Sequence, residues 1–429
     1  MIVGRRTVVR AAVLTAAVAC GVAQAQTTDP LTLVPQADAG EPTGDAIALR
    51  AELARDQFDR RFASGSIPSW QNRVALDFRH EWSLGGWKLG LSDRLEQVGA
   101  SDGDETRNAL REAYASKAIG SAGFLDAGRI NWRNGVGIGF NPTDFLKRGA
   151  LVAQTTQNPQ ALRENRLGTV MLRAQAVSML GSAQLALIPD LADTASTSAT
   201  APAWDRTNSA RAALLKFAPN TGGRTSLDVL GYARAGERPR LGMNASRLIG
   251  DAWVAHAEWV GAVARPLAGP GEAPRDERWT NALTAGVTWT TPAGIVLALE
   301  RQYSGDALTP DRWSNWQAVL SSPRAAQFGT QYGAMRSMRA SDQAPLTRDA
   351  WFARAAWDDA FGVRGIDLVA ITRVNADDHS RLWQGEAHWH VSDRHSVQVI
   401  VGGYAGGPTS EYGSAAIRRY AQVGWLVYF

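Results

Sequence analysis

The sequence contains a single cysteine, Cys20, and it lies in an N-terminal segment that we expect to be removed. Without it the chain has no thiol, which excludes disulfides and thiolate-bound metals. Lysine is almost as scarce: only residues 88, 117, 147 and 216 are lysine, so arginine carries nearly all the positive charge. After the N-terminal segment no stretch approaches 18 consecutive apolar residues, so no transmembrane helix is predicted.

The first 25 residues have the composition of an export signal. Three arginines lie before residue 11, residues 11–19 are apolar, and Ala23-Gln24-Ala25 supplies the small residues that signal peptidase requires. The sequence therefore predicts export, with cleavage near Ala25. Removing those arginines from the 45 basic residues leaves 42 against 41 acidic ones, so nucleic acid is not an expected partner.

The last ten residues alternate in character. One face carries Ala421, Val423, Trp425, Val427 and Phe429, and the other is mixed. Alternation over about ten residues suits a strand that crosses a bilayer at a tilt. An aromatic last residue on such a strand is typical of bacterial outer-membrane barrels. We therefore expect localisation in the outer membrane, contact with its lipid and lipopolysaccharide, and recognition of Phe429 by the barrel-assembly machinery.

The same alternation recurs along most of the chain and predicts seventeen strands. They lie near 73–82, 87–96, 109–117, 123–133, 166–177, 181–188, 209–217, 225–235, 240–249, 253–264, 279–290, 294–303, 350–357, 366–375, 381–391, 396–403 and 420–429. Short and long connections alternate between them, as periplasmic turns and outer loops do in barrels. The 16 tryptophans fit the aromatic belts at the two membrane interfaces.

Residues 26–66 allow two interpretations. The first part, 26–43, is a polar periplasmic linker, whereas the apolar spacing from Asp45 to Phe62 predicts a short amphipathic helix. The alternation over 47–53 allows a first strand instead, and an even strand count favours one. The predicted fold is all-β: a transmembrane antiparallel β-barrel of 16–18 strands, with 18 as the best estimate. It spans 67–429 and follows a short N-terminal periplasmic helix.

The segment 123–173 offers the most candidates for the pore. In residues 129–133 the odd positions are expected to face the lumen, and Ile130 and Trp132 the lipid. Asn141-Pro142 favours a turn, and Thr143-Asp144 can cap one helical turn. The loop 134–165 either folds inward and narrows the pore or covers the outer rim. The predicted pore-lining residues are Arg129, Asn131, Arg133, Lys147, Arg148, Arg173, Glu386 and His388.

The run Ala127-Gly128-Arg129, then Trp132 and Gly135, then Asn141-Pro142-x-Asp144, resembles a strand-and-loop signature of alginate-export-type barrels and related porin-like families. Where that signature has Arg-Gln, this chain has Arg129-Ile130. The resemblance implies an outer-membrane channel of 16–18 strands, in which lumen arginines select an anionic polysaccharide. The inward faces here also carry carboxylates, so the sequence does not predict strong anion selectivity. These are Asp77, Glu81, Glu96, Asp228, Glu258, Glu300, Asp367 and Glu386.

The predicted function is a porin-like channel for diffusion or export of small polar or charged solutes, or of a secreted polysaccharide. No enzyme activity, cofactor or metal is predicted. One alternative is a barrel enzyme acting on lipid or lipopolysaccharide, through His80 or the cluster Glu386, His388 and His390. Another is a structural or assembly barrel whose loop 304–349 binds a partner. The Gly-x-Ser-x-Gly match at 99–103 lies in a polar connection and predicts a turn rather than a nucleophile elbow.

Overall fold

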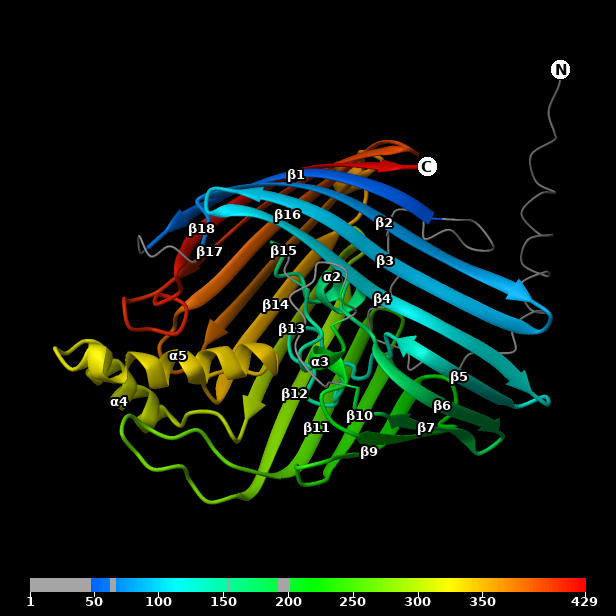
Figure 1. Cartoon of the computed structure of the whole chain (residues 1–429), viewed down its shortest axis with the longest axis horizontal. Coiled ribbons are helices and arrows are strands. Elements are labelled where there is room, and N and C mark those ends of the chain that lie inside the picture. Colours follow the sequence, from blue (N-terminus) through cyan, green and yellow to red (C-terminus); the bar gives the residue numbers. More distant parts are fainter. Residues whose placement is uncertain (1–47, 62–66, 153–154, 192–200, 202) are drawn as a thin grey trace.

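The chain forms a closed β-barrel (Figure 1). The computed structural model describes residues 48–61, 67–152, 155–191, 201 and 203–429. Eighteen antiparallel strands follow one another in chain order, and β1 pairs with β18 to close the sheet. The predicted barrel and its strand number are therefore confirmed. The predicted signal peptide and the linker 26–43 lie outside the described residues.

The strands are β1 (Ala48–Arg60), β2 (Trp70–Leu84), β3 (Trp87–Ala100), β4 (Gly103–Ile119), β5 (Gly123–Ile130), β6 (Thr169–Ser178), β7 (Gly181–Ile188), β8 (Ala212–Pro219), β9 (Thr225–Arg234), β10 (Arg240–Ile249), β11 (Trp253–Ala264), β12 (Arg278–Thr290), β13 (Ile295–Ser304), β14 (Asp349–Trp357), β15 (Ile366–Asn375), β16 (Arg381–Ser392), β17 (His395–Ala405) and β18 (Ile417–Tyr428). The helices are α2 (Pro159–Glu164), α3 (Trp204–Thr207), α4 (Pro310–Leu320), α5 (Ala325–Ser341) and the 3-10 turn η1 (Ala360–Gly362). Among the described residues no helix is long and apolar enough to cross a membrane.

The N-terminal helix expected between Asp45 and Phe62 is wrong, because residues 48–60 form β1. The apolar residues of this segment have helical spacing, but hydrogen bonding to the neighbouring strands β2 and β18 stabilises the extended conformation instead. Glu52 ion-pairs with Arg73 of β2 at 3.2 Å, and β18 supplies the second neighbour, so neither edge is left open. The described part of the barrel therefore includes residues 48–60, and the first strand, the alternative interpretation of this segment, is the one observed.

The outer face of the barrel is apolar and the inner face polar, the reverse of a soluble sheet. On β18 the side chains of Ala421, Val423 and Trp425 are exposed, as predicted, while Tyr420 and Gln422 are buried. Exposed leucine, valine and tryptophan recur on the outward positions of the other strands. Such a surface is the kind that a lipid bilayer covers.

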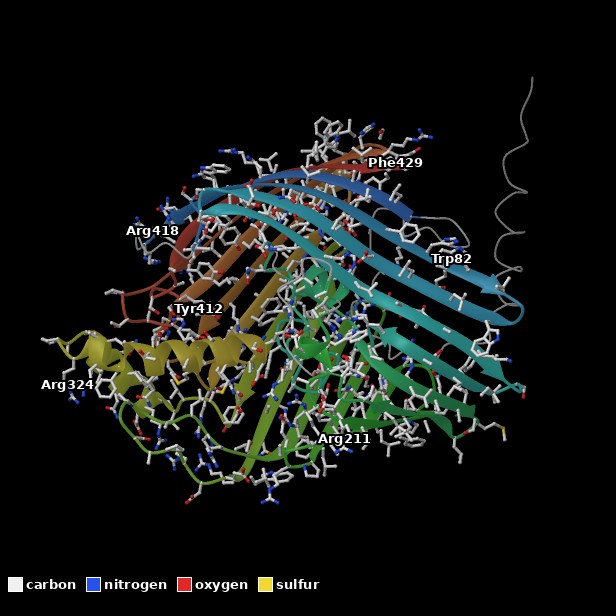
Figure 2. All side chains as sticks on the ribbon, in the orientation of Figure 1. Trp82, Arg211, Arg324, Tyr412, Arg418 and Phe429 are labelled. Carbon is white, nitrogen blue, oxygen red and sulfur yellow. The ribbon has the colours of Figure 1, made fainter. Side chains whose placement is uncertain are left out.

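The two ends of the barrel differ in their connections. Short turns gather at one end, and α4 and α5 project from the other; Figure 2 places Trp82 near the turn end and Arg324 at the tip of the helical loop. The connection expected over 98–108 is shorter than predicted, since β3 and β4 extend to a two-residue turn at Ser101 and Asp102. The Gly-x-Ser-x-Gly match therefore lies at a hairpin turn, in agreement with the prediction for it.

Candidate functional site

A segment between β5 and β6 folds into the lumen. This inner loop, residues 131–152 and 155–168, includes α2 and lies inside the barrel in Figure 1. It contacts β10 to β13 on one side of the wall and β1 and β16 on the other. Of the two alternatives left by the sequence, inward folding is the one observed.

Glu258 of β11 anchors the first part of the inner loop. Its carboxylate is fully buried and accepts hydrogen bonds from the Gly137 amide, from Asn141 Nδ2 at 3.1 Å, and from the amide and hydroxyl of Thr143 at 3.2 and 2.9 Å. A Cβ at Gly135 would lie 2.5 Å from the same carboxylate. The absence of a side chain at Gly135 thus allows the backbone to approach a buried acid.

Glu300 of β13 holds the adjoining turn. It accepts from the amides of Ile138 at 2.5 Å and Gly139 at 2.8 Å, and His256 Nε2 lies 2.8 Å from it. The Ile138 side chain packs in an apolar cluster with Phe352 and other wall residues. Charged acceptors bind amides more strongly than neutral ones do, so these contacts fix the position of the loop.

The opposite wall holds the second part of the inner loop. Glu386 of β16 accepts from Thr156 Oγ1 at 2.5 Å and from Asn158 Nδ2 at 3.1 Å. Asp56 of β1 accepts from Thr155 Oγ1 at 2.7 Å. The inner loop is therefore attached on both sides and spans the lumen.

A buried ion pair braces the inner loop from within. Arg166 contacts Asp144 at 2.6 Å, with side chains 3% and 2% exposed, and it also donates to Asn131 Oδ1 at 2.8 Å.

Trp132 and Ile130 were expected to face lipid, and this prediction is wrong. Both are buried with Phe145 in an apolar cluster formed between the loop and the inner wall. Ile130 is the last residue of β5 and shares its inward face with Asp126, so the predicted phase of this strand was wrong by one residue. Trp132 lies beyond the end of β5, in the inner loop.

We expect Asp144→Asn to destabilise the protein by about 3–5 kcal/mol, because it leaves a buried arginine without its counter-charge. Denaturant unfolding followed by tryptophan fluorescence in detergent would measure this. Asp251→Asn is the matched control, since Asp251 is 98% exposed in a turn and should have almost no effect. Equal stability of the two variants would show that the Arg166 pair does not brace the loop.

The loop carrying α4 and α5 reaches back over the inner loop. Ser341 accepts from the Gly149 amide at 3.1 Å, and Gln343 donates to the Lys147 carbonyl at 2.7 Å. Arg148 binds Asp342 at 2.5 Å and also Glu237 at 2.5 Å. The outer helical loop and the inner loop are therefore connected directly.

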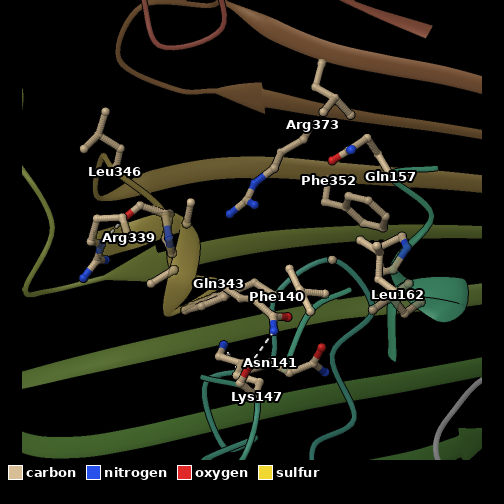
Figure 3. A pocket seen from close by; sticks show the side chains of 18 of the residues that line it. Phe140, Asn141, Lys147, Gln157, Leu162, Arg339, Gln343, Leu346, Phe352 and Arg373 are labelled. Atoms are coloured by element: carbon tan, nitrogen blue, oxygen red, sulfur yellow. Dashed lines mark hydrogen bonds between the residues drawn. The ribbon is translucent and has the colours of Figure 1, made fainter. Parts of the chain in front are cut away.

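These two loops and the wall enclose a cavity of about 340 Å³, which we call the central cavity (Figure 3). One side of it is apolar, with Phe140, Leu162, Leu346 and Phe352. Its charged lining consists of five cations, Lys147, Arg163, Arg336, Arg339 and Arg373, and two acids, Asp144 and Glu411. The labelled Arg373 extends from β15 toward the cavity in Figure 3.

The cavity has a positive electrostatic balance. Asp144 is neutralised by Arg166, and burial raises the pKa of Glu411 above its ordinary value. Arg339 is partly balanced by Asp306 at 2.8 Å. Two buried guanidinium nitrogens of Arg373, Nε and one Nη, have no hydrogen-bond partner among the described residues. Donors left unsatisfied in this way favour an incoming anion or water.

The carboxylates counted on the inward faces are mostly engaged by other groups. Asp77 contacts Arg94 at 2.6 Å and Arg111 at 2.6 Å, within a cluster of arginines and acids on β1 to β4. Asp228 pairs with Lys216 at 3.4 Å. Because Glu258, Glu300 and Glu386 hold the inner loop, a count of charges along the sequence overestimates the negative charge that a solute meets.

The predicted pore-lining residues occupy different positions. Lys147 lines the central cavity, donating to the Asn141 carbonyl at 2.7 Å. Arg148 joins the inner loop to the helical loop through Asp342, and it also binds Glu237 in the connection between β9 and β10. Arg129 is 2% exposed and donates to the Gly168 carbonyl at 2.9 Å. Asn131 binds the carbonyl of Arg163 at 3.1 Å within the inner loop.

The remaining four predicted residues lie on or near the inner wall. Arg173 pairs with Asp126 at 2.8 Å, and Arg133 lies 3.8 Å from Glu164 of α2. Glu386 anchors the inner loop, with His388 3.6 Å from it. The set is therefore not one cluster, and only Lys147 among the eight borders the central cavity.

Four of the five cavity cations were not among the predicted pore-lining residues: Arg163 of α2, Arg336, Arg339 and Arg373. Arg373 shares the inward face of β15 with Asp367 and Ile371, and that alternation was a usable signal. Arg336 and Arg339 lie on α5, inside a loop of no predicted structure. Their i, i+3 spacing on one face of a helix was the signal for these two.

Burial in the inner loop lowers the pKa of Lys147 to about 8, although nearby Asp144 and Glu258 favour the charged form. Lys147 is therefore protonated below pH 8 and loses its charge above it. We expect any preference of the pore for anions to decrease between pH 7 and 9. Reversal potentials across that range would show it, and Lys147→Met should remove this step. A pH response that persists in the variant would assign it to another group.

The histidines named for an enzyme have structural contacts. His80 packs edge-on against Trp82, with ring centroids 4.5 Å apart. His390 lies 2.9 Å from Ser396 Oγ and 3.1 Å from Asp367, the residue types of a hydrolase triad. Ser396 is 3% exposed, so the carbonyl carbon of a substrate has no access to its hydroxyl.

Within the described residues no group of three His, Cys, Asp or Glu is placed to hold a metal ion.

Comparison with known proteins identifies the architecture. No family model and no curated protein matches the chain. Among solved structures, it is similar to OccK11 (OpdR) of Pseudomonas aeruginosa, with a TM-score of 0.52, 12% identity, and coverage of 89% of this chain and 95% of that one. OccK2 (OpdF) in complex with glucuronate, from the same organism, gives 0.51 and 13%, covering 89% and 97%. OpdL of Pseudomonas aeruginosa gives 0.51 and 10%, covering 90% and 98%.

At these identities the similarity shows the fold. The chain has the closed barrel of these Pseudomonas proteins, a porin-like architecture, over nearly its whole described length.

Proposed function

We propose that the protein is a channel of the bacterial outer membrane for small solutes and that it prefers anions. The observation that carries this proposal is the inner loop, anchored to both walls, which narrows the lumen beside a cavity with an excess of cations. Groups of fixed charge at a constriction filter solutes by size and sign. The apolar outer face and the aromatic last residue, Phe429, support placement in the outer membrane.

The similarity to OccK2 supports the same class of solute. That protein was crystallised in complex with glucuronate, a small anion. A cavity of about 340 Å³ is comparable to the pockets that hold small molecules.

Export of a polymer, which the resemblance to alginate-export-type barrels suggested, remains the second hypothesis. It requires the inner loop to leave the lumen, because a polysaccharide chain needs a continuous wide path. The attachments at Glu258, Glu300 and Glu386 favour the small-solute function over this one.

A liposome-swelling assay with the purified barrel tests the proposed function. We expect uptake of small anionic solutes to exceed that of uncharged and cationic solutes of equal size, and oligosaccharides to be excluded. Swelling that is independent of charge would overturn the anion preference. No swelling from a folded barrel would overturn the channel itself.

A further inference from the structure

Two exposed arginines lie on the outward face of the barrel near its loop end. Arg381 is the first residue of β16, and Arg419 is the third of β18. Trp383 of β16 pairs with Gly403 of β17, which pairs with Arg419, so all three share one face. Two residues further along β18, that face carries exposed Ala421, and it is therefore the face directed at lipid.

Gly403 lets the two flanking side chains approach each other over its backbone. A Cβ at this position would lie 2.7 Å from the Arg418 carbonyl oxygen and 3.4 Å from both Trp383 Nε1 and Arg419 Cγ. Trp383 is 38% exposed. Strands are spaced about 4.8 Å apart, so Trp383 and Arg419 arise about 10 Å from each other, and arginine side chains reach across that span. Gly403 is itself buried beneath these two side chains, so a head group would meet the exposed surfaces of Trp383 and Arg419 and not the Gly403 backbone.

The charge at this place is not balanced by the protein. Arg301, on the same outward face, binds Asp349 at 2.8 Å, but neither Arg381 nor Arg419 makes an ion pair within the described parts of the chain. Asp59 of β1 lies opposite Arg419 in register without forming such a pair. A cation on a lipid-facing surface is unfavourable unless a counter-ion accompanies it.

An apolar strip continues from these residues toward the turn end. Val399 and Val401 of β17 and Val423 of β18 are 38%, 43% and 56% exposed on the same face. A cationic site above an apolar strip matches a molecule with an anionic head and hydrocarbon chains. Guanidinium groups and an indole N–H are donors that suit phosphate oxygens.

We propose that Arg381, Trp383 and Arg419 bind the phosphorylated head group of an outer-leaflet glycolipid, whose acyl chains lie along the valine strip. The proposal rests on the proposed placement of the barrel in the outer membrane, with its long loops outside. The bound lipid supplies the counter-charge that the lipid-facing arginines lack. It also fixes the depth of this part of the wall in the outer leaflet.

Binding of defined lipids to the purified full barrel, measured by native mass spectrometry, tests the proposal. The probes are bisphosphorylated lipid A, dephosphorylated lipid A and inorganic phosphate. We expect the double variant Arg381→Ala with Arg419→Ala to bind bisphosphorylated lipid A about tenfold more weakly than the wild type, since two charged donors are removed. Asp59→Asn should strengthen binding. Arg247→Ala is the matched control, because Arg247 is an exposed outward residue near the turn end of β10.

Equal affinity of the wild type and the double variant would overturn the proposal, as would equal affinity for the two forms of lipid A. Inorganic phosphate that competes at equal concentration would show a free-anion site instead and would also overturn it. The conductance of the double variant should be unchanged. Phosphate-dependent lipid binding by a barrel that conducts nothing would contradict the proposed function and leave the lipid site supported.

Discussion

The double variant Glu258→Ala with Glu300→Ala is expected to raise single-channel conductance several-fold. These two carboxylates accept hydrogen bonds from five residues of the inner loop: from the amides of Gly137, Ile138 and Gly139, from the Asn141 side chain, and from the amide and hydroxyl of Thr143. Hydrogen bonds to charged groups each contribute about 1.5–3 kcal/mol. Without them the loop loses its attachment to β11 and β13 and no longer narrows the lumen.

Glu96→Ala is the matched control for this experiment. Glu96 is also a buried wall carboxylate, 3% exposed, but its ion pairs are with Arg94 and Arg107 of the wall and not with the inner loop. We expect its conductance to stay close to that of the wild type. Conductance that rises equally in both variants would show that wall charge, and not loop attachment, limits the current.

The second large effect is expected at Arg373. Replacement by glutamate changes the charge bordering the central cavity by two units, in a site where five cations face two acids. We expect the reversal potential in a salt gradient to move toward cation preference, because charges in a confined lumen act at short range and are weakly screened.

Two further variants complete the test at Arg373. Arg373→Gln removes the charge without adding an acid beside Glu411, and should give an intermediate reversal potential. Arg247→Glu makes the same charge reversal on the outward face near the turn end and should leave selectivity unchanged. If all three variants match the wild type, Arg373 does not face the ion path.

The wall of the barrel was predictable from the sequence because the pattern that specifies it is local. Alternation of apolar and polar residues sets which face of a strand meets lipid, and β18 shows it at Ala421, Val423 and Trp425. The local pattern was insufficient at β1, where helical and strand spacing overlap. There the deciding factor was pairing with β18, more than 350 positions away in the chain, and no local pattern encodes it.

The site was less predictable because its contacts join distant segments. Thr143 reaches Glu258, and Thr156 reaches Glu386, across more than a hundred residues in each case. From the sequence alone, Glu258 and Glu386 would be counted as unpaired acids facing the lumen, although both accept hydrogen bonds from the inner loop. These contacts remove their negative charge from the path of a solute and leave the central cavity cationic, and a list of inward-facing charged residues does not reveal this.

The most direct test of this account is single-channel recording in a planar bilayer, with the reversal potential measured across a potassium chloride gradient. We expect stable conductance steps and, at neutral pH, a reversal potential shifted toward the equilibrium potential of chloride. A reversal potential shifted toward the equilibrium potential of potassium would contradict a cationic central cavity. A folded barrel that never conducts would contradict the proposed channel function.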